Sequence, residues 1–331
     1  MAVAAGALRF NSDSLKMELF DGNQWVEVVA SSPDLQTGGA RGLFAGGYTP
    51  TYNQGIDYIN ISTTGNAVSF GQLTAAVVGN SGCASATRGI WAGAYSPGTY
   101  YNTIQYVTIS STGNAVSFGG LINPTFGCNS LASSTRGVTL GGFTPVSVAI
   151  NTIQYITIAS TGNAVNFGQL SGTKYSASTC ASSTRGLYAG GSPTTNTIEF
   201  ITISTLGNSA SFGQLTAACS SGGEGGCSNS TRGIFSKQNA PSASSGIDYV
   251  TIATLGNAVS FGSLTATKSQ TGACASSIRG IFAGGYSAPN AFSSLIEYVT
   301  IATTGNGITF GNLTTTSRRP FGCSNGHGGL G

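Results

Sequence analysis

Charge is scarce in this chain, because 13 Lys or Arg and 10 Asp or Glu among 331 residues amount to only 7 per cent charged residues. Typical globular domains have about a quarter. The net charge of +3 is weak, and no basic run or interleaving of basic with aromatic residues occurs, so nucleic-acid binding has little support. Gly, Ser, Thr and Asn fill most non-apolar positions. The sequence therefore predicts a polar but nearly uncharged surface.

The groups that catalysis and metal binding require are equally few. His327 is the single histidine and lies in a glycine-rich stretch, where no nucleophile, base and orienting acid can be assembled around it. The acidic residues fall about one per repeat rather than in the pairs that glycosidases use. No C-x-x-C pair, phosphate-binding glycine loop or sialidase-type Asp-box occurs. We expect no enzymatic activity, no cofactor and no metal.

Long hydrophobic segments are also missing. No run of about 18 apolar residues could span a membrane, and residues 1–8 are apolar but lack the basic flank and the length of a signal peptide. We expect the chain to be made and folded in a cytoplasm, without a membrane span.

What the chain has in abundance is repetition: one unit recurs six times, with 47 to 49 residues between successive copies. An Arg-Gly step opens an apolar run, a run of the form Ile-x-Tyr or Ile-x-Phe follows, and a Gly-Asn step leads into Phe-Gly-x-Leu. Each run has the β-branched and aromatic composition of a strand. The arginines are Arg41, Arg88, Arg136, Arg185, Arg232 and Arg279, and the phenylalanines of Phe-Gly are Phe70, Phe118, Phe167, Phe212, Phe261 and Phe310.

The Gly-Asn step, Gly65-Asn66 in the first copy, lies between the second and third runs. Both residue types tolerate the positive φ angles of a tight hairpin turn. The sequence therefore predicts that these two runs are hairpin partners joined by such a turn.

A stretch of small residues carrying one cysteine precedes each Arg-Gly step from the second copy on, and another one, at residues 321–325, ends the chain. Four short strands per unit of this length are typical of propeller blades. We predict an all-β fold, a six-bladed β-propeller over residues 36–331, whose first blade is closed by the C-terminal strand. The cysteines are Cys83, Cys128, displaced by about three residues, Cys180, Cys227, Cys274 and Cys323.

The repeat resembles that of kelch-like β-propellers, in which a double glycine ends the second strand, an apolar strand with an acidic residue and a Tyr follows, and an aromatic residue precedes Leu. This resemblance implies the fold and leaves the function open. The second copy has Gly93-Ala94, the fifth has Ser236-Lys237, and Phe-Gly replaces the usual Trp. The double glycines are Gly46-Gly47, Gly141-Gly142, Gly190-Gly191 and Gly284-Gly285.

The repeated cysteines should lie on the strands that line the central axis. Equivalent positions on neighbouring blades are usually farther apart than the 7 Å or so between Cα atoms that a disulfide allows, so we expect free, small, buried thiols. A metal-binding ring of thiols is the alternative. Cys219 lies outside the pattern and is expected to be a loop thiol.

The six arginines of the Arg-Gly steps are matched by four acidic residues in the slot between Ile and Tyr or Phe. This periodicity predicts structural pairing within or between blades, with guanidinium groups against carboxylates or backbone carbonyls. Gln105 and Gln154 keep the hydrogen-bonding capacity of the slot. An arginine ring that binds an anion or a glycan at the propeller mouth is the alternative. The acids are Asp57, Glu199, Asp248 and Glu297.

Residues 1–35 do not belong to the repeat. The stretch 8–28 alternates around turn signals at 11–14 and 21–23, which predicts a three-stranded meander. It is similar to a short module that recurs in tailed-phage fibre and other virion proteins, and Phe10, Phe20 and Trp25 are its candidate attachment residues. A meander this small is marginally stable alone, so we expect it to pack on the propeller or on other chains. The matching residues are Arg9, Phe10, Asn11, Glu18, Phe20, Asp21, Gly22 and Trp25.

The module implies a non-enzymatic structural component of a tailed-phage virion, either a tail or fibre accessory or a capsid-surface protein. Its partners would be other virion proteins and further copies of itself. The alternatives are a carbohydrate-binding propeller that recognises a host-surface glycan and a cytoplasmic kelch-like adaptor. In each case the loops after the double glycines would form the contact surface, as exposed loops often do. The candidate rim contacts are Tyr48, Tyr52, Tyr95, Tyr100 and Tyr101.

Overall fold

The computed structural model describes residues 3–11, 16–27, 40–220, 225–237, 244–287 and 291–330. The chain divides into two compact units, Met1–Thr37 and Gly38–Gly331, and each is considered by itself. The domain boundary expected at residue 35 and most of the turn expected at 11–14 lie outside the described residues.

The N-terminal unit is the predicted three-stranded meander. Strands β1 (Leu8–Asn11), β2 (Lys16–Phe20) and β3 (Trp25–Glu27) pair antiparallel in this order. The turn between β2 and β3 is held by the Asp21 carboxylate, which accepts hydrogen bonds of 2.8 Å from the backbone N–H groups of Asn23 and Gln24. Such an Asx turn is what an aspartate at this position favours.

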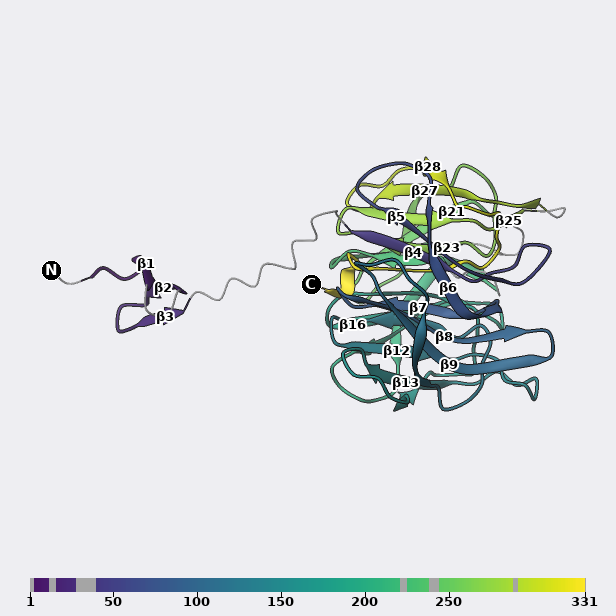
Figure 1. The fold of residues 1–331 in the computed structure, drawn as a ribbon, viewed down its shortest axis with the longest axis horizontal. Coiled ribbons are helices and arrows are strands. Elements are labelled where there is room, and N and C mark those ends of the chain that lie inside the picture. Colours follow the sequence, from purple (N-terminus) through teal and green to yellow (C-terminus); the bar gives the residue numbers. More distant parts are fainter. Residues whose placement is uncertain are drawn as a thin grey trace. The chain divides into compact units, whose positions relative to one another are not determined.

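The second unit is the predicted six-bladed propeller of four-stranded antiparallel sheets. Figure 1 shows the tip of the β8–β9 hairpin and β25 on one side of the propeller, and the C-terminus with η1 on the other. Blades 1 to 3 are β29 (Phe321–Ser324), β4 (Arg41–Ala45), β5 (Asn53–Asn60) and β6 (Val68–Val77); β7 (Ser81–Ala84), β8 (Arg88–Ser96), β9 (Thr99–Thr108) and β10 (Val116–Gly120); and β11 (Asn129–Ala132), β12 (Arg136–Leu140), β13 (Thr152–Thr157) and β14 (Val165–Gln169).

Blades 4 to 6 repeat this order from the inner to the outer strand. Blade 6 also carries a small additional hairpin in its rim loop, formed by β25 (Tyr286–Ser287) and β26 (Ala291–Phe292). The blades are β15 (Ser178–Ala181), β16 (Arg185–Ala189), β17 (Thr195–Thr202) and β18 (Ala210–Cys219); β19 (Gly226–Ser228), β20 (Arg232–Ser236), β21 (Gly246–Thr251) and β22 (Val259–Ser263); and β23 (Gly272–Ala275), β24 (Arg279–Ala283), β27 (Leu295–Thr300) and β28 (Ile308–Asn312).

The ring closes as predicted, because the C-terminal strand β29 is the inner strand of blade 1. It pairs antiparallel with β4, with Phe321 opposite Ala45 and Cys323 opposite Leu43. The two ends of the propeller chain are therefore held together by a strand ladder within one blade, which removes the free edges at which the ring would open.

The double glycines end the second strands because the backbone turns there through the left-handed region. In blade 1 the φ angles are +71° at Gly46 and +101° at Gly47, and the pairs of blades 3, 4 and 6 are alike. Residues with a Cβ rarely adopt this conformation.

The prediction for the Gly-Asn steps is only half right. The third and fourth strands are hairpin partners, as expected. However, neither Gly65 nor Asn66 has a positive φ angle, and residues 61–67 between β5 and β6 form a longer connection than a tight turn. Instead, the step contacts the preceding blade: the N–H of Gly65 donates to the Phe310 carbonyl at 2.9 Å, and Asn66 Oδ1 accepts from the Asn312 N–H at 3.0 Å.

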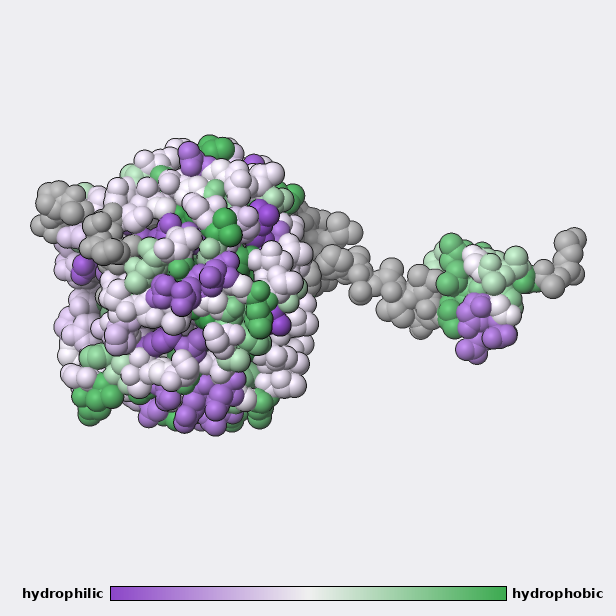
Figure 2. All heavy atoms as spheres, turned by 180° about the vertical axis from the view of Figure 1, so that it is seen from behind, coloured by the Kyte–Doolittle hydropathy of each residue, from purple (hydrophilic) through white to green (hydrophobic). Residues whose placement is uncertain are grey.

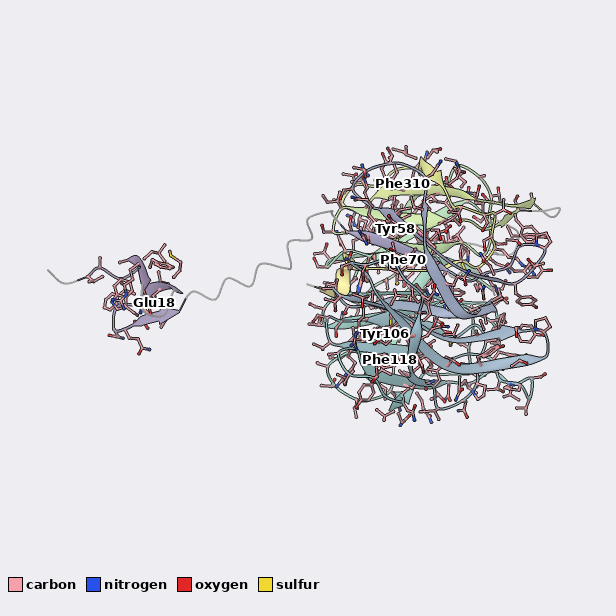
Figure 3. All side chains as sticks on the ribbon, in the orientation of Figure 1. Glu18, Tyr58, Phe70, Tyr106, Phe118 and Phe310 are labelled. Atoms are coloured by element: carbon pink, nitrogen blue, oxygen red, sulfur yellow. The ribbon has the colours of Figure 1, made fainter. Side chains whose placement is uncertain are left out.

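The hydrophobic core lies between neighbouring blades. The phenylalanine of each Phe-Gly step is buried and meets the aromatic ring of the third strand edge to face, as in Tyr58–Phe70 at 5.9 Å and Tyr106–Phe118 at 5.8 Å (Figure 3). Ile156 and Ile158 of blade 3 join the cluster around Phe118 of blade 2. This seam between blades 2 and 3 recurs around the ring.

The described part of the chain contains no helix with the length and hydropathy needed to cross a bilayer.

Candidate functional site

The six arginines of the Arg-Gly steps connect each blade to the next one, so we call them the arginine clasp. Arg232 of blade 5, for example, donates to the carbonyls of Ile301 and Ala302 in blade 6, both at 2.9 Å, and its guanidinium stands 4.4 Å above the Tyr249 ring of its own blade. The other five do the same: Arg41 to Ile109, Arg88 to Ile158, Arg136 to Ile203, Arg185 to Ile252 and Arg279 to Ile61. Backbone carbonyls therefore occupy these arginines all around the ring.

The acidic residues do not meet the arginine clasp. They point to the preceding blade, where Glu297 accepts hydrogen bonds from the Thr265 N–H at 2.7 Å and from Lys268 at 2.6 Å. Gln105 takes the same position and accepts from the N–H of Thr74 at 2.8 Å. Charges and amides thus link the blades in both directions around the ring.

The pKa values of two of these acids shift in opposite directions. Desolvation raises the pKa of Asp57, although hydrogen bonds from Thr314 oppose it. At Glu199 desolvation also favours the neutral acid, but hydrogen bonds from Lys174, Ser209 and Ser171 outweigh it and lower the pKa.

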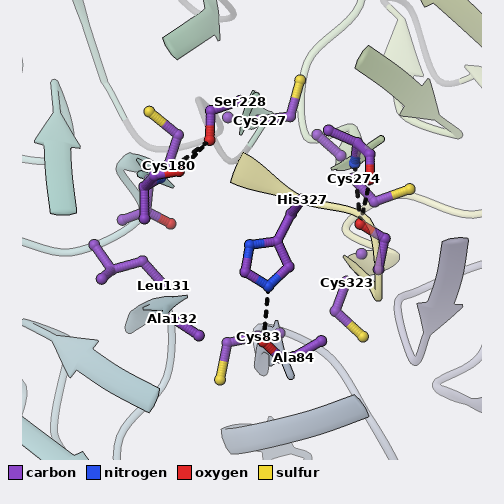
Figure 4. Close-up of a pocket in the computed structure, with 18 of the residues that line it drawn as sticks. Cys83, Ala84, Leu131, Ala132, Cys180, Cys227, Ser228, Cys274, Cys323 and His327 are labelled. Atoms are coloured by element: carbon purple, nitrogen blue, oxygen red, sulfur yellow. Dashed lines mark hydrogen bonds between the residues drawn. The ribbon is translucent and has the colours of Figure 1, made fainter. Parts of the chain in front are cut away.

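The inner strands surround a central cavity of about 410 Å³, open space at its mouth included. His327 extends into it: its Nε2–H donates to the Ala84 carbonyl at 2.7 Å and its Nδ1 accepts from the Gly329 N–H at 3.1 Å. The 3₁₀ helix η1 (Gly328–Leu330) follows and packs against β11, β15 and β19. Figure 4 shows the labelled cysteines around the imidazole with their sulfur atoms directed away from it.

These sulfur atoms pack against the neighbouring blade, which explains the glycine of the Arg-Gly step. A Cβ at Gly42 would lie 2.6 Å from Cys274 Sγ, and one at Gly233 would lie 2.6 Å from Cys180 Sγ. Burial raises the pKa of the Cys83 thiol to about 12, so such thiols are poor nucleophiles at neutral pH. Among the described residues, no group of three or more His, Cys, Asp or Glu side chains is placed to hold a metal.

All seven cysteines are free and buried, but two expectations about them are wrong. Leu131, rather than Cys128, takes the cysteine position of blade 3, because Leu131 lies opposite Val138 and packs against Gly186 of the next blade. Cys219 is not a loop thiol, since it ends the outer strand β18 in the core of blade 4.

On the side of the double glycines, five of the six blades carry a short backbone pairing beyond their four strands among the described residues. The residue after the double glycine pairs with the residue five positions before the inner-strand cysteine or its leucine equivalent. These positions vary between blades, unlike the repeated core. The pairs are Tyr48 with Arg318, Tyr95 with Val78, Phe143 with Phe126, Ser192 with Tyr175 and Tyr286 with Ser269.

Aromatic side chains at and beside these pairs form a continuous surface from blade 6 through blade 1 to blade 3. Ring centroids follow one another at 5.1 to 6.2 Å, in tilted or edge-to-face contacts. All these side chains are half-buried. We call this surface the aromatic rim: Tyr286, Phe292, Tyr48, Tyr52, Tyr95, Tyr100 and Phe126.

Four of the five tyrosines predicted as rim contacts lie in the aromatic rim. Tyr101 does not, because its ring packs against the core of blades 1 and 2 and its hydroxyl lies 3.0 Å from Ser96 Oγ. Tyr286 and Phe292 belong to one of the loops after the double glycines, which the sequence predicted as a contact surface. The two residues themselves were not predicted. Phe126 was missed entirely, although its constant spacing before the inner strand could have indicated it.

Two arginines, also missed from sequence, accompany the aromatic rim. The Arg318 guanidinium stands 4.6 Å above the Tyr48 ring and within 5.9 Å of the Tyr286 and Phe292 rings. Arg319 stands 4.9 Å from the Phe126 ring. Tyr52 lies in the same cluster: desolvation, with Tyr95 and Tyr48 nearby, raises its pKa, whereas the positive charge of Arg318 opposes the rise. The arrangement offers aromatic faces and positive charge to a ligand.

The three candidate attachment residues of the N-terminal unit lie on both faces of its sheet. Phe20 and Trp25 pack together at 5.3 Å, and Arg9 stands 4.2 Å above the Trp25 ring while it pairs with Glu18. Phe10 is on the opposite face and is 59 per cent exposed.

A scan against models of protein families gave no match, and no curated protein matches the chain.

Proposed function

We propose that this protein is a non-enzymatic structural component of a tailed-phage virion, which docks through its N-terminal meander and displays its kelch-like propeller. The observation that carries this proposal is an apolar face of the meander that its own three strands leave exposed. Leu8, Phe10 and Met17 point to this face and are 61, 59 and 45 per cent exposed. A three-stranded sheet needs such a face covered for stability.

The other face of the meander carries residues that match the virion-type module proposed from the sequence. Glu18 binds both Arg9, at 2.7 Å, and the amide of Asn11, at 3.0 Å, and Arg9 covers Trp25. These residues shape the sheet from one side. Phe10 is therefore the attachment residue that the geometry favours, whereas Phe20 and Trp25 support the sheet.

Incorporation into particles tests this proposal. Phe10→Asp should remove the protein from purified particles, as measured by quantitative mass spectrometry, because a carboxylate would be buried in the docked interface. Leu206→Asp on the propeller is the matched control, since Leu206 is exposed to a similar degree, 58 per cent. Particles that lack the wild-type protein would refute the virion role and favour a cytoplasmic adaptor, and normal incorporation of Phe10→Asp would refute the docking face.

The second candidate is a carbohydrate-binding propeller that recognises a host-surface glycan, and the aromatic rim favours it. Tyrosine and phenylalanine faces stack on the C–H faces of sugar rings, and tyrosine adds a polar hydroxyl. Figure 2 shows a propeller surface of mostly weakly polar residues. Saturable binding of any saccharide, lost in Tyr52→Ala, would support this role, and both roles can hold for one protein.

A further inference from the structure

We propose that the aromatic rim binds an acidic saccharide and that Arg318 is the residue that recognises its carboxylate. This inference rests on the second candidate function and names the ligand class of that site.

Most other charges of the described propeller have partners within it. The six arginines of the clasp donate to backbone carbonyls, as described above. The lysines Lys174, Lys237 and Lys268 pair with Glu199, Asp248 and Glu297, and Asp57 binds Thr314. Two further basic residues, Arg318 and Arg319, lie beside aromatic rings of the rim; Arg319 is buried, whereas Arg318 is half-buried. Charge in this propeller is thus used mostly for architecture, and Arg318 is the half-buried arginine at the rim.

Arg318 is held in place by its backbone and by the aromatic rings beside it. Its backbone exchanges two hydrogen bonds with Tyr48, of 2.9 and 3.0 Å, which fixes the arginine beside the ring. Contacts with aromatic rings occupy the face of a guanidinium and leave its in-plane N–H groups to bind a ligand. No acidic side chain in the described part of the chain forms an ion pair with Arg318, and the residue is only half-buried. Such a fork matches a carboxylate in a bidentate manner.

The aromatic rings around this arginine lie close together. Tyr48, Tyr52 and Phe292 lie next to one another at 5.3 and 5.9 Å, close enough for one ligand to touch several of them. A sugar ring offers both C–H faces and hydroxyls to such a surface, and a uronic or sialic acid adds the carboxylate. An acidic peptide would share only the charge.

The test is binding of the full-length protein to an array of uronic-acid and sialic-acid saccharides, set beside neutral saccharides and a poly-glutamate peptide. An acidic saccharide that binds is then measured by titration calorimetry against its methyl ester, which keeps the sugar and removes the charge. We expect the ester and the Arg318→Gln variant each to weaken binding roughly tenfold or more, as loss of a charge-assisted pair does. Arg318→Lys should recover part of the affinity, and the affinity should fall as salt rises.

Three results would overturn the proposal. Equal binding of acid and ester would refute the role of Arg318 while leaving the carbohydrate function intact. Binding of the peptide alone would show that the ligand is a protein. The absence of binding to every saccharide on the array would refute both this proposal and the carbohydrate function, without bearing on incorporation into particles.

The control variant is Val146→Ala, in an exposed rim loop of blade 3. It should bind as the wild type does.

Discussion

The two rims of the propeller use the same chemistry for different purposes. On the rim of the Arg-Gly steps, each arginine stands over an aromatic ring and donates to the next blade, as Arg232 does over Tyr249. On the opposite rim, Arg318 stands over Tyr48 at a similar distance, but no described residue of another blade accepts its guanidinium N–H groups. A contact that recurs in all six blades holds the ring together, whereas we propose that the contact made by Arg318, which occurs in a single place, serves a ligand.

The comparison also separates the two kinds of sequence variation in this chain. Between blades the buried residue that follows each Arg-Gly step changes only among Leu, Ile and Val, because neighbouring blades share one packed seam. The rim pairs change from Tyr–Arg to Phe–Phe to Ser–Tyr, because they lie outside the seam that neighbouring blades share. Function is therefore to be sought where the repeat is broken.

The largest effect is expected in the repeated core. Phe118→Ala should lower the free energy of unfolding by about 3–5 kcal/mol, because the ring is 4 per cent exposed and fills the seam between blades 2 and 3. Chemical denaturation measures this loss. A loss below about 1 kcal/mol would contradict the assignment of the Phe-Gly-x-Leu strand to the interior.

A smaller but sharper effect concerns the glycine of the Phe-Gly step. Gly71→Ala would place its Cβ against the backbone carbonyl of Gly113 in the next blade, and the two blades would have to separate. We expect a loss of about 3 kcal/mol in unfolding free energy. Gly113→Ala is the matched control, since a Cβ at Gly113 meets no atom. Equal losses in the two variants would show that chain flexibility, rather than contact between blades, explains these glycines.

The smallest effect concerns His327, which extends into the central cavity and has no counterpart in the repeat. Desolvation in the central cavity lowers the pKa of its imidazole below the ordinary 6.5. As the pH falls below 6.5, the unfolded chain therefore binds more protons than the folded one, and the stability that the neutral imidazole contributes is lost. Unfolding free energies at pH 7 and pH 5 should differ more in the wild type than in His327→Gln. Because the carboxyl groups are common to both proteins, an equal pH dependence would contradict the placement of the ring.

Much of the fold was predictable because the propeller repeats itself. Strand order, blade number and closure by β29 follow from the spacing of Arg-Gly, Phe-Gly-x-Leu and the cysteines. The Gly-Asn steps were misread as tight turns, because their role is a contact with another blade and no local pattern shows it. Leu131 was missed for a similar reason. The nearby Cys128 suggested the register of the inner strand of blade 3, but the side chain that fills the space against Gly186 of the next blade is Leu131.

The candidate site was predictable only in part. Tyr48, Tyr52, Tyr95 and Tyr100 could be found because they occupy the variable loops after the double glycines. Arg318 precedes the last inner strand. The corresponding positions of the other blades share no residue type that would have indicated a site there. Only the backbone pairing with Tyr48 brings it to the rim.

The most direct test of this division of labour compares Arg232→Gln with Arg318→Gln in equilibrium unfolding. Arg232→Gln removes charge-assisted hydrogen bonds to two carbonyls of blade 6 and should cost about 2 kcal/mol. Arg318→Gln should change the stability by less than about 0.5 kcal/mol, as substitutions outside the structural network do. If instead Arg318→Gln destabilised the propeller as much as Arg232→Gln, the arginine of the aromatic rim would be architecture too.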